Sequence, residues 1–219
     1  MLAEWGERHP GERLLVWASG GRDSAAVLAL AVDALGPERV VPVFRYLVEG
    51  LRCVELPIRA QLARLGIRAR LVTVPGFDAL NLLRNGEYTW WQCSGAERKV
   101  QWRDVYEHAL RKTGCAWSAS GEKKADSLMR RMRLTNGGVH EKQRKLYPVW
   151  DWSHARVAAL VRTRKLPLAP TFGRESQGGV GLKAEVLREL KERYPEDYAR
   201  VEAAFPFCGA VVARQEMFG

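Results

Sequence analysis

One stretch of the chain, residues 14–28 (LLVWASGGRDSAAVL), constrains its fold most strongly. The stretch begins as an apolar run of the length of a buried strand and passes through a short polar turn with two glycines. It then continues with apolar residues at helical spacing. A strand that leads through a tight turn into a helix is the first half of a β-α-β unit. Such units form parallel sheets with right-handed crossovers, so the stretch predicts an α/β fold.

The same alternation of apolar runs and helical patterns continues along the chain. The apolar runs predict five strands, at residues 14–18, 40–44, 70–74, 115–119 and 146–150. The helical patterns predict helices at residues 24–35, 52–65, 97–112, 123–134, 154–164, 181–193 and 196–204. We therefore expect a five-stranded, mostly parallel sheet with helices on both faces. Residues 1–152 would form this α/β domain, and residues 153–219 would be a helical C-terminal extension and tail of the same domain.

The charge of the chain is unevenly spread. The net charge is +10, and residues 122–145 hold eight basic and three acidic side chains. Basic surfaces attract anions, so a nucleotide or nucleic acid is a candidate partner at this basic patch. The alternative is a solvated charged face without a partner.

Other features of the composition limit the class of protein. No apolar run reaches 18 residues, so no membrane span is expected. The polar N-terminal stretch lacks an apolar signal core, which favours a cytoplasmic protein. The four cysteines form no CxxC pair, so a zinc ribbon or a local iron–sulfur motif is not expected.

The turn of the opening stretch has the composition of an anion site. Gly20 and Gly21 follow the first strand, and glycines allow backbone amides to converge on a phosphate. The helix that follows adds free N–H groups and its positive dipole end, and Ser19 and Ser24 can add hydroxyl donors. Asp23 would cap the helix, or hold a metal or a ligand hydroxyl. The alternative is an ordinary strand–helix turn capped by Asp23.

A second candidate segment follows the fourth predicted strand, which ends at Gly121. On a helical wheel, Ala125, Leu128, Met129 and Met132 share one arc, which we expect to pack on the sheet. The opposite arc is polar and mostly cationic, and carries Lys123, Lys124, Ser127, Arg130 and Arg131. In a parallel sheet this segment would start on the same rim as the glycine turn, so both together would suit a polyanion.

These segments resemble those of a known family. Ser19-Gly20-Gly21-Arg22-Asp23-Ser24 is similar to the SGGxDS signature of the PP-loop superfamily of adenine-nucleotide enzymes. Residues 120–131, residues 147–153 and the Leu-Pro at 166–167 resemble further blocks of the phosphoadenosine phosphosulfate (PAPS) reductases. The resemblance implies an adenine nucleotide alpha hydrolase-like fold that binds its nucleotide with Ser19–Ser24 and with Gly121, Lys123, Lys124, Ser127, Arg130 and Arg131.

The resemblance also bears on two cysteines, Cys208 and Cys93. Reductases of this family attack the bound sulfonucleotide with a thiolate from a Glu-Cys-Gly tail, and a thioredoxin-like donor resolves the product. Cys208-Gly209 would be that tail here, although Phe207 replaces the glutamate and no histidine follows. Cys208 is thus a candidate catalytic residue, and a buried tail cysteine is the alternative. Cys93 has no cysteine beside it, so no iron–sulfur cluster is expected.

Three functions remain open from the sequence. The first is reduction of PAPS to sulfite and adenosine bisphosphate, with Cys208 as nucleophile. The second is an ATP pyrophosphatase that adenylates an acceptor with ATP and Mg²⁺ during sulfur transfer to nucleic acid or another acceptor; Asp23 would then be central. The third is a non-catalytic nucleotide or nucleic-acid binding module. The sequence gives no firm prediction of a cofactor, apart from ATP with Mg²⁺ in the adenylating case, it predicts no metal-ligand set, and it leaves a homo-oligomer open.

Overall fold

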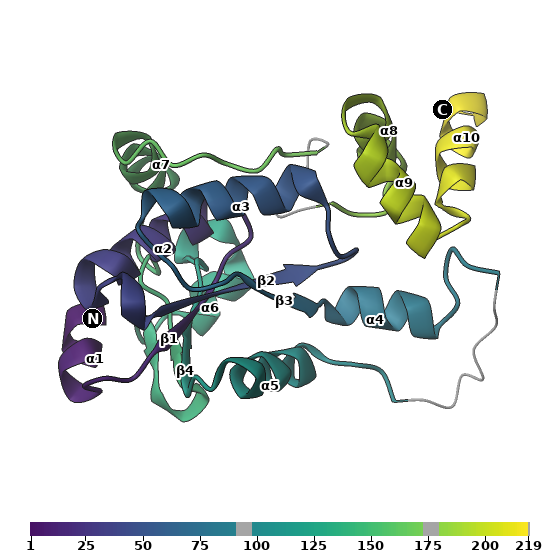
Figure 1. The fold of residues 1–219 in the computed structure, drawn as a ribbon. Coiled ribbons are helices and arrows are strands. Elements are labelled where there is room, and N and C mark those ends of the chain that lie inside the picture. Colours follow the sequence, from purple (N-terminus) through teal and green to yellow (C-terminus); the bar gives the residue numbers. More distant parts are fainter. Residues whose placement is uncertain (91–97, 173–179, 219) are drawn as a thin grey trace. The chain divides into compact units, whose positions relative to one another are not determined.

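A computed structural model of the chain describes residues 1–90, 98–172 and 180–218 (Figure 1). By packing, the chain divides into two compact units. The first comprises residues 1–44, 57–72 and 108–168, and the second comprises residues 45–56, 73–107 and 169–219. The sequence-based boundary at residue 152 separates a nucleotide-binding domain from its extension. It stays a prediction, because the units are defined by packing and not by function.

A mostly parallel sheet runs in the strand order β3-β2-β1-β4-β6-β5. The strands are β1 Leu14–Trp17, β2 Val40–Tyr46, β3 Val72–Pro75, β4 Trp117–Ala119, β5 Val139–His140 and β6 Lys145–Leu146. β1 is parallel to both β2 and β4, and β4 is parallel to β6. β5 runs antiparallel to β6. The α/β class is confirmed, but the predicted five strands become six, because the two-residue edge strand β5 contains no apolar run. Of the predicted strand at residues 146–150, only Leu146 lies in a strand, β6.

The core of the first unit lies between β1 and helix α2 (Arg22–Leu35). Leu14, Leu15 and Val16 of β1 have no exposed surface. The buried face of α2 is mostly alanine, so its backbone can approach the sheet closely. The helix ends at Gly36, whose φ of +82° is accessible mainly to glycine, and Pro37 follows.

The remaining helices alternate with the strands or follow them. They are α1 Leu2–Arg8, α3 Arg52–Arg64, α4 Phe77–Arg84, α5 Trp102–Thr113, α6 Leu128–Arg133, α7 His154–Thr163, α8 Ala184–Arg193, α9 Pro195–Ala204 and α10 Cys208–Phe218. Within the first unit, α2 and residues 57–64 of α3 lie on one face of the sheet, and residues 108–113 of α5 lie on the other (Figure 1).

The predicted helix at residues 123–134 is wrong in its continuity and in its packing. The segment consists of a 3-10 turn, Lys124–Asp126, and the separate helix α6. Ser127 between them is extended, with φ −167° and ψ 162°, and its side chain accepts a hydrogen bond from the Arg130 N–H. Because the helix starts anew after Ser127, the residues before and after it do not share one helical face, and the predicted apolar arc does not exist. Leu128, Met129 and Met132 are accordingly 69%, 75% and 65% exposed, not packed on the sheet.

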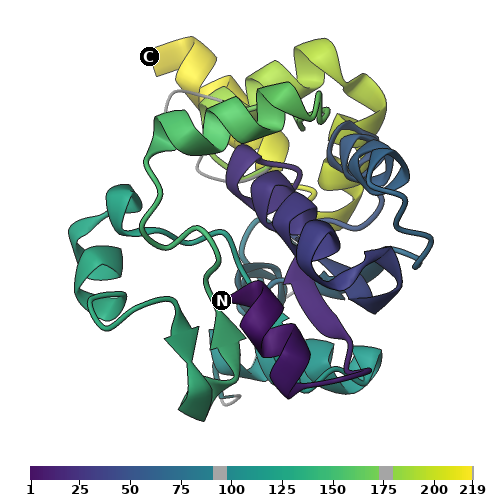
Figure 2. The ribbon, with the colours of Figure 1, turned by 90° about the vertical axis from the view of Figure 1, so that its left-hand side faces the viewer.

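Helix α6 and the β5–β6 hairpin form one edge of the first unit. Figure 2 shows both in teal and green, apart from the purple β1 and α2. The hairpin turns at Arg144, which adopts a left-handed conformation with φ +52°. The basic patch of residues 122–145 therefore lies on this edge.

The second unit contains the helical C-terminal region, in which α8, α9 and α10 pack on one another. This region confirms the predicted helical extension. The carboxylate of Asp197 on α9 is 2% exposed and accepts the backbone N–H groups of Arg52 (2.9 Å) and Cys53 (2.7 Å). A side chain of α9 thereby satisfies the first N–H groups of α3 within this unit.

Candidate functional site

The loops that follow β1 and β4 lie at the point where the strand order of the sheet reverses. β1 has β2 on one side and β4 on the other, and all three run parallel. Their carboxyl ends therefore share one edge, and in open α/β sheets ligands bind outside that edge at such a switch point. The structure thus brings the glycine turn and the segment after Gly121 together, as the sequence predicts.

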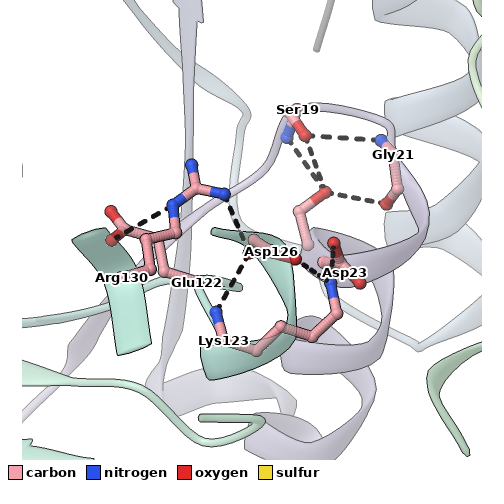
Figure 3. A network of polar contacts seen from close by, with 8 residues as sticks. Ser19, Gly21, Asp23, Glu122, Lys123, Asp126 and Arg130 are labelled. Atoms are coloured by element: carbon pink, nitrogen blue, oxygen red, sulfur yellow. Dashed lines mark hydrogen bonds and ion pairs between the residues drawn. The ribbon is translucent and has the colours of Figure 1, made fainter. Parts of the chain in front are cut away.

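The first loop, residues 18–24, is closed by hydrogen bonds among its own residues (Figure 3). The Ser24 hydroxyl donates to the Gly21 carbonyl (2.9 Å) and accepts the Ser19 N–H (3.2 Å). Because that donation uses its only hydrogen, the Ser19 hydroxyl is the donor in the 3.0 Å contact between the two hydroxyls. The two serine hydroxyls are thus engaged inside the loop in this structure.

The glycines of this loop have distinct roles. Gly20 is buried and has a φ of +77°, which glycine adopts without strain. Gly21 is the N-cap residue of α2, and no side chain caps this helix among the described residues. The expected capping role of Asp23 is therefore wrong, because Asp23 lies inside the first turn. The first N–H groups of α2 keep their capacity to bind an anion.

The side chain of Asp23 points from α2 toward the second loop. Its Oδ2 accepts a hydrogen bond from Lys123 Nζ at 2.6 Å, and its side chain is 38% exposed. Lys123 Nζ also donates to Asp126 Oδ1 at 2.6 Å, and the Lys123 side chain has no exposed surface. The ammonium group is therefore shared between two carboxylates, which is how a charge of this kind is stabilised on burial.

Asp126 extends this network to the start of α6. Burial raises the pKa of the Asp126 carboxyl, but hydrogen bonds and charge from Lys123, together with the charge of Arg130, outweigh it and lower the pKa overall. Arg130 donates to Asp126 at 2.8 Å and lies 3.9 Å from Glu122, which also contacts Arg133. Figure 3 shows the chain of contacts from Asp23 to Glu122.

Gly121 sets the distance between the two loops. A Cβ built on it would lie 2.8 Å from the carbonyl carbon of Asp23 and 2.9 Å from its Cβ. Real Cβ atoms do not approach backbone that closely, so this position requires glycine. Gly121 lies two residues beyond the end of β4, and its predicted part in nucleotide binding stays a prediction.

The remaining predicted cations are directed elsewhere. Lys124 Nζ lies 4.2 Å from the centre of the Trp150 ring, and its backbone N–H donates to the Trp150 carbonyl. Ser127 is the N-cap residue of α6, which has only six residues. Arg22 and Arg131 are exposed. Of the basic side chains predicted in this segment, Lys123 and Arg130 belong to the network described above.

Sequence reasoning missed two participants of this site. Asp126 was counted only as one of the acidic residues of the basic patch, although its spacing from Lys123 suits a local ion pair. Gln61, on α3, donates from Nε2 to the carbonyl oxygens of Gly20 (3.1 Å) and Pro167 (2.6 Å) and has no exposed surface. No local pattern points to Gln61, because its partners are 41 and 106 residues away.

The basic patch continues along the hairpin edge. Arg131, Lys142 and Arg144 are exposed there, and Arg133 lies over the Tyr147 ring at 5.7 Å. Burial, and next the charge of Arg133, lower the pKa of Lys145. The patch therefore combines exposed and half-buried cations.

The cysteines that the structure describes are buried free thiols: Cys53, Cys115 and Cys208. Cys208 is the first residue of α10 in the second unit and has no exposed surface. Burial, and next the Glu202 charge, raise the pKa of the Cys208 thiol, and a hydrogen bond with Tyr198 offsets this in part. Cys93 lies outside the described residues.

The described residues hold neither a metal-binding cluster nor a helix that could cross a membrane. Residues 1–90, 98–172 and 180–218 hold no cluster of three or more His, Cys, Asp or Glu side chains that could bind a metal ion. Within the same ranges, each helix is too short or too polar to cross a membrane.

No protein-family model and no curated protein matches the chain. Among solved structures, the chain is similar to the U34-tRNA thiolase NcsA from Methanococcus maripaludis with its 4Fe-4S cluster. The TM-score is 0.48 and the sequence identity is 12%, and the match covers 91% of this chain and 72% of that chain.

Two expectations from the sequence concern this neighbour: the absence of an iron–sulfur cluster and the resemblance to the PAPS reductases. Because that structure carries a 4Fe-4S cluster, it contradicts the prediction that no iron–sulfur cluster is expected, and the prediction is withdrawn. That prediction rested on the lack of a second cysteine next to Cys93 in the sequence. Local spacing says nothing of cluster ligands from distant parts of a sequence. The neighbour is a thiolase, and the resemblance to the PAPS reductase family stays a prediction.

Proposed function

We propose that the chain is an adenine-nucleotide enzyme of the ATP pyrophosphatase type, which adenylates an acceptor in the course of sulfur transfer to nucleic acid. One observation carries this proposal. The uncapped N-terminus of α2 and the partly exposed carboxylate of Asp23 lie side by side, at the edge of the sheet where α/β proteins bind ligands.

The first part of the proposal concerns the phosphates. The loop at Gly20 and Gly21 leads directly into α2, which is 14 residues long. Its first N–H groups and its dipole favour a bound anion. The β- and γ-phosphates of ATP would lie here, so that the acceptor attacks the α-phosphorus and pyrophosphate leaves.

The second part concerns the carboxylate. Carboxylate oxygens are the ligands that Mg²⁺ prefers in proteins, and Asp23 offers one with solvent access. When bound, Mg²⁺ would neutralise the charge that develops on the phosphates. Asp126 is less suited to this role, because Lys123 and Arg130 already bind its two oxygens. Lys123 fixes the direction of the Asp23 carboxylate.

The third part concerns the acceptor. The hairpin edge exposes Arg131, Lys142 and Arg144 on the same unit as the two loops. Basic side chains bind the nucleic-acid backbone through its phosphates. A nucleic acid is therefore the acceptor that we propose.

The reductase function has less support. It requires a reactive thiolate, whereas Cys208 is a fully buried thiol with a raised pKa. We therefore assign Cys208 a packing role, and we do not expect a thioredoxin-like donor.

Calorimetric titration of the reduced protein tests the proposal directly. We expect binding of ATP that Mg²⁺ strengthens, together with pyrophosphate release when an acceptor is present. Asp23→Asn should weaken the Mg²⁺-dependent part of ATP binding, and Cys208→Ala serves as the control that should not. Metal-independent binding of PAPS and of adenosine 3′,5′-bisphosphate, with loss of sulfite release in Cys208→Ser, would instead establish the reductase.

A further inference from the structure

Gln61 occupies an unusual place between two backbone segments of the first unit. It lies near the end of α3, has no exposed surface, and donates from Nε2 to the carbonyl oxygens of Gly20 and Pro167. The first carbonyl belongs to the loop after β1, and the second to the segment that follows α7. A single side-chain nitrogen therefore joins the candidate nucleotide loop to a segment 106 residues beyond Gln61.

The chemistry of the two partners fixes the identity of this side chain. Carbonyl oxygens only accept hydrogen bonds, so the amide nitrogen must face both of them and the amide cannot be flipped. Each of the two Nε2 hydrogens has one acceptor. Gln61 Oε1 is buried and accepts no hydrogen bond from the described part of the chain. The side chain thus serves the two backbone carbonyls, which neither an apolar residue nor a carboxylate could do.

The bond to Gly20 determines where the next N–H group points. The described peptide bonds are trans, so the carbonyl of Gly20 and the N–H of Gly21 lie in one plane and point in opposite directions. Holding the carbonyl toward α3 therefore directs the Gly21 N–H away from α3. There this N–H meets the Ser19 hydroxyl at 3.4 Å, a long contact that a better acceptor can replace.

We propose that Gln61 is a positioning residue for the anion loop, which holds the Gly21 N–H in the orientation that a phosphate oxygen requires. Glycines flank this peptide on both sides, so few steric clashes limit its rotation, and the hydrogen bond from Gln61 opposes that rotation. The second bond, to Pro167, holds the amide itself in place. This inference rests on the proposed function, because it assumes that the loop binds phosphates.

The test separates phosphate binding from nucleoside binding. We would titrate wild type, Gln61→Met and Gln61→Asn with ATP and Mg²⁺, with inorganic pyrophosphate and Mg²⁺, and with adenosine. Both variants should bind ATP and pyrophosphate about tenfold more weakly, which is the effect of losing one hydrogen bond of ordinary strength. Their affinity for adenosine should equal that of wild type. Gln61→Asn keeps the amide but is too short to reach both carbonyls, and it covers the case in which Gln61→Met does not fold.

A matched control excludes a general loss of stability. Ile58 is also fully buried on α3, and Ile58→Val should lower the thermal midpoint while leaving the affinity for pyrophosphate unchanged. In protein labelled with ¹⁵N-glycine, pyrophosphate should shift the Gly21 amide signal in wild type and in Ile58→Val, and shift it less in the Gln61 variants.

The outcomes are distinguishable. If wild type binds pyrophosphate and the Gln61 variants bind it equally well, the inference is overturned while the proposed function stands. Equal weakening for all three ligands would also overturn it, because it would indicate a general structural role. If wild type binds neither ATP nor pyrophosphate, the proposed function fails, and this inference fails with it.

Discussion

The loops after β1 and β4 lie at the same edge of the sheet, but they are stabilised in different ways. The loop after β1 is closed by bonds between its own Ser19, Gly21 and Ser24. The loop after β4 depends on its neighbour, because Lys123 reaches across to Asp23 and Gly121 packs against it. Apart from the bond from Gln61 to the Gly20 carbonyl, the first loop is thus held by local contacts, whereas the second requires that the first already be in place. Substitutions in the two loops should differ accordingly.

Removal of the shared ammonium should have the largest effect. Lys123→Met leaves the buried Asp126 carboxylate without its main partner, and losing one member of a buried ion pair costs about 3 kcal/mol. Equilibrium unfolding in urea measures this loss. Lys124→Met is the matched control, because Lys124 lies on Trp150 and should lose less than about 1 kcal/mol. Equal losses in both variants would mean that the Asp23–Lys123 contact does not hold the second loop.

Filling the space between the loops should rank next. Gly121→Ala places a methyl group 2.8 Å from the backbone of Asp23, and such overpacking costs about 2 kcal/mol. The free energy of unfolding of Gly181→Ala provides the comparison, since a Cβ there meets no atom within 4 Å. A fully stable Gly121→Ala protein would show that the two loops are not in close contact.

A change within the self-closed loop should be smaller. Gly20→Ala puts a side chain on a residue with a φ of +77°, which costs about 1 kcal/mol. Gly21→Ala should cost less, because its extended backbone suits any residue and its Cβ would lie 3.4 Å from the Ser19 hydroxyl. Denaturant melts of the two variants rank them, and the reverse order would contradict the loop geometry described above.

The ion pairs also predict a dependence on pH. The native pKa of Asp126 is lowered, so its contribution to stability is complete above the ordinary pKa of a carboxyl group. It is lost as the pH falls through the lowered native pKa. Unfolding free energies of wild type and Asp126→Asn from neutral to acidic pH should therefore converge at the acid end. A constant difference between the two proteins would show that Asp126 is not ionised in the native state.

Substitutions on the exposed side of α6 should have the smallest effect. The triple variant Leu128→Ser, Met129→Ser, Met132→Ser should change the free energy of unfolding by no more than about 0.5 kcal/mol at each site. Leu134→Ala, one residue past α6, should cost about 3 kcal/mol because Leu134 is fully buried. A large loss of unfolding free energy in the triple variant would show that these side chains pack on the sheet, as the sequence suggested.

The accuracy of the sequence predictions follows the same local and non-local division. The strand, turn and helix of residues 14–35 could be predicted because apolar periodicity, glycines and the stop at Gly36-Pro37 all lie within one segment. The α/β class and helices α7, α8 and α9 followed from the same kind of pattern, whereas α10 was not predicted. Both α1 and α4 were missed, because each is a short helix of eight residues or fewer with few apolar positions to repeat.

The segment after β4 could not be predicted from its own residues. A wheel assumes a continuous helix, and the extended Ser127 interrupts it. Lys123 was assigned to the cationic face that would meet a ligand, whereas burial between two carboxylates makes it an internal counter-ion. Gln61 could not be predicted either, because its partners, Gly20 and Pro167, lie in distant parts of the sequence.

The carboxylate of Asp197 constrains the order in which a newly made chain can fold. It binds the first N–H groups of α3, at Arg52 and Cys53, from 145 and 144 residues further along. While the ribosome extends the chain, α3 must therefore wait for α9 before its first turn is fully hydrogen-bonded. A nascent chain that stops short of residue 197 exposes that turn to water, so the completion of α3 should be among the last steps of folding.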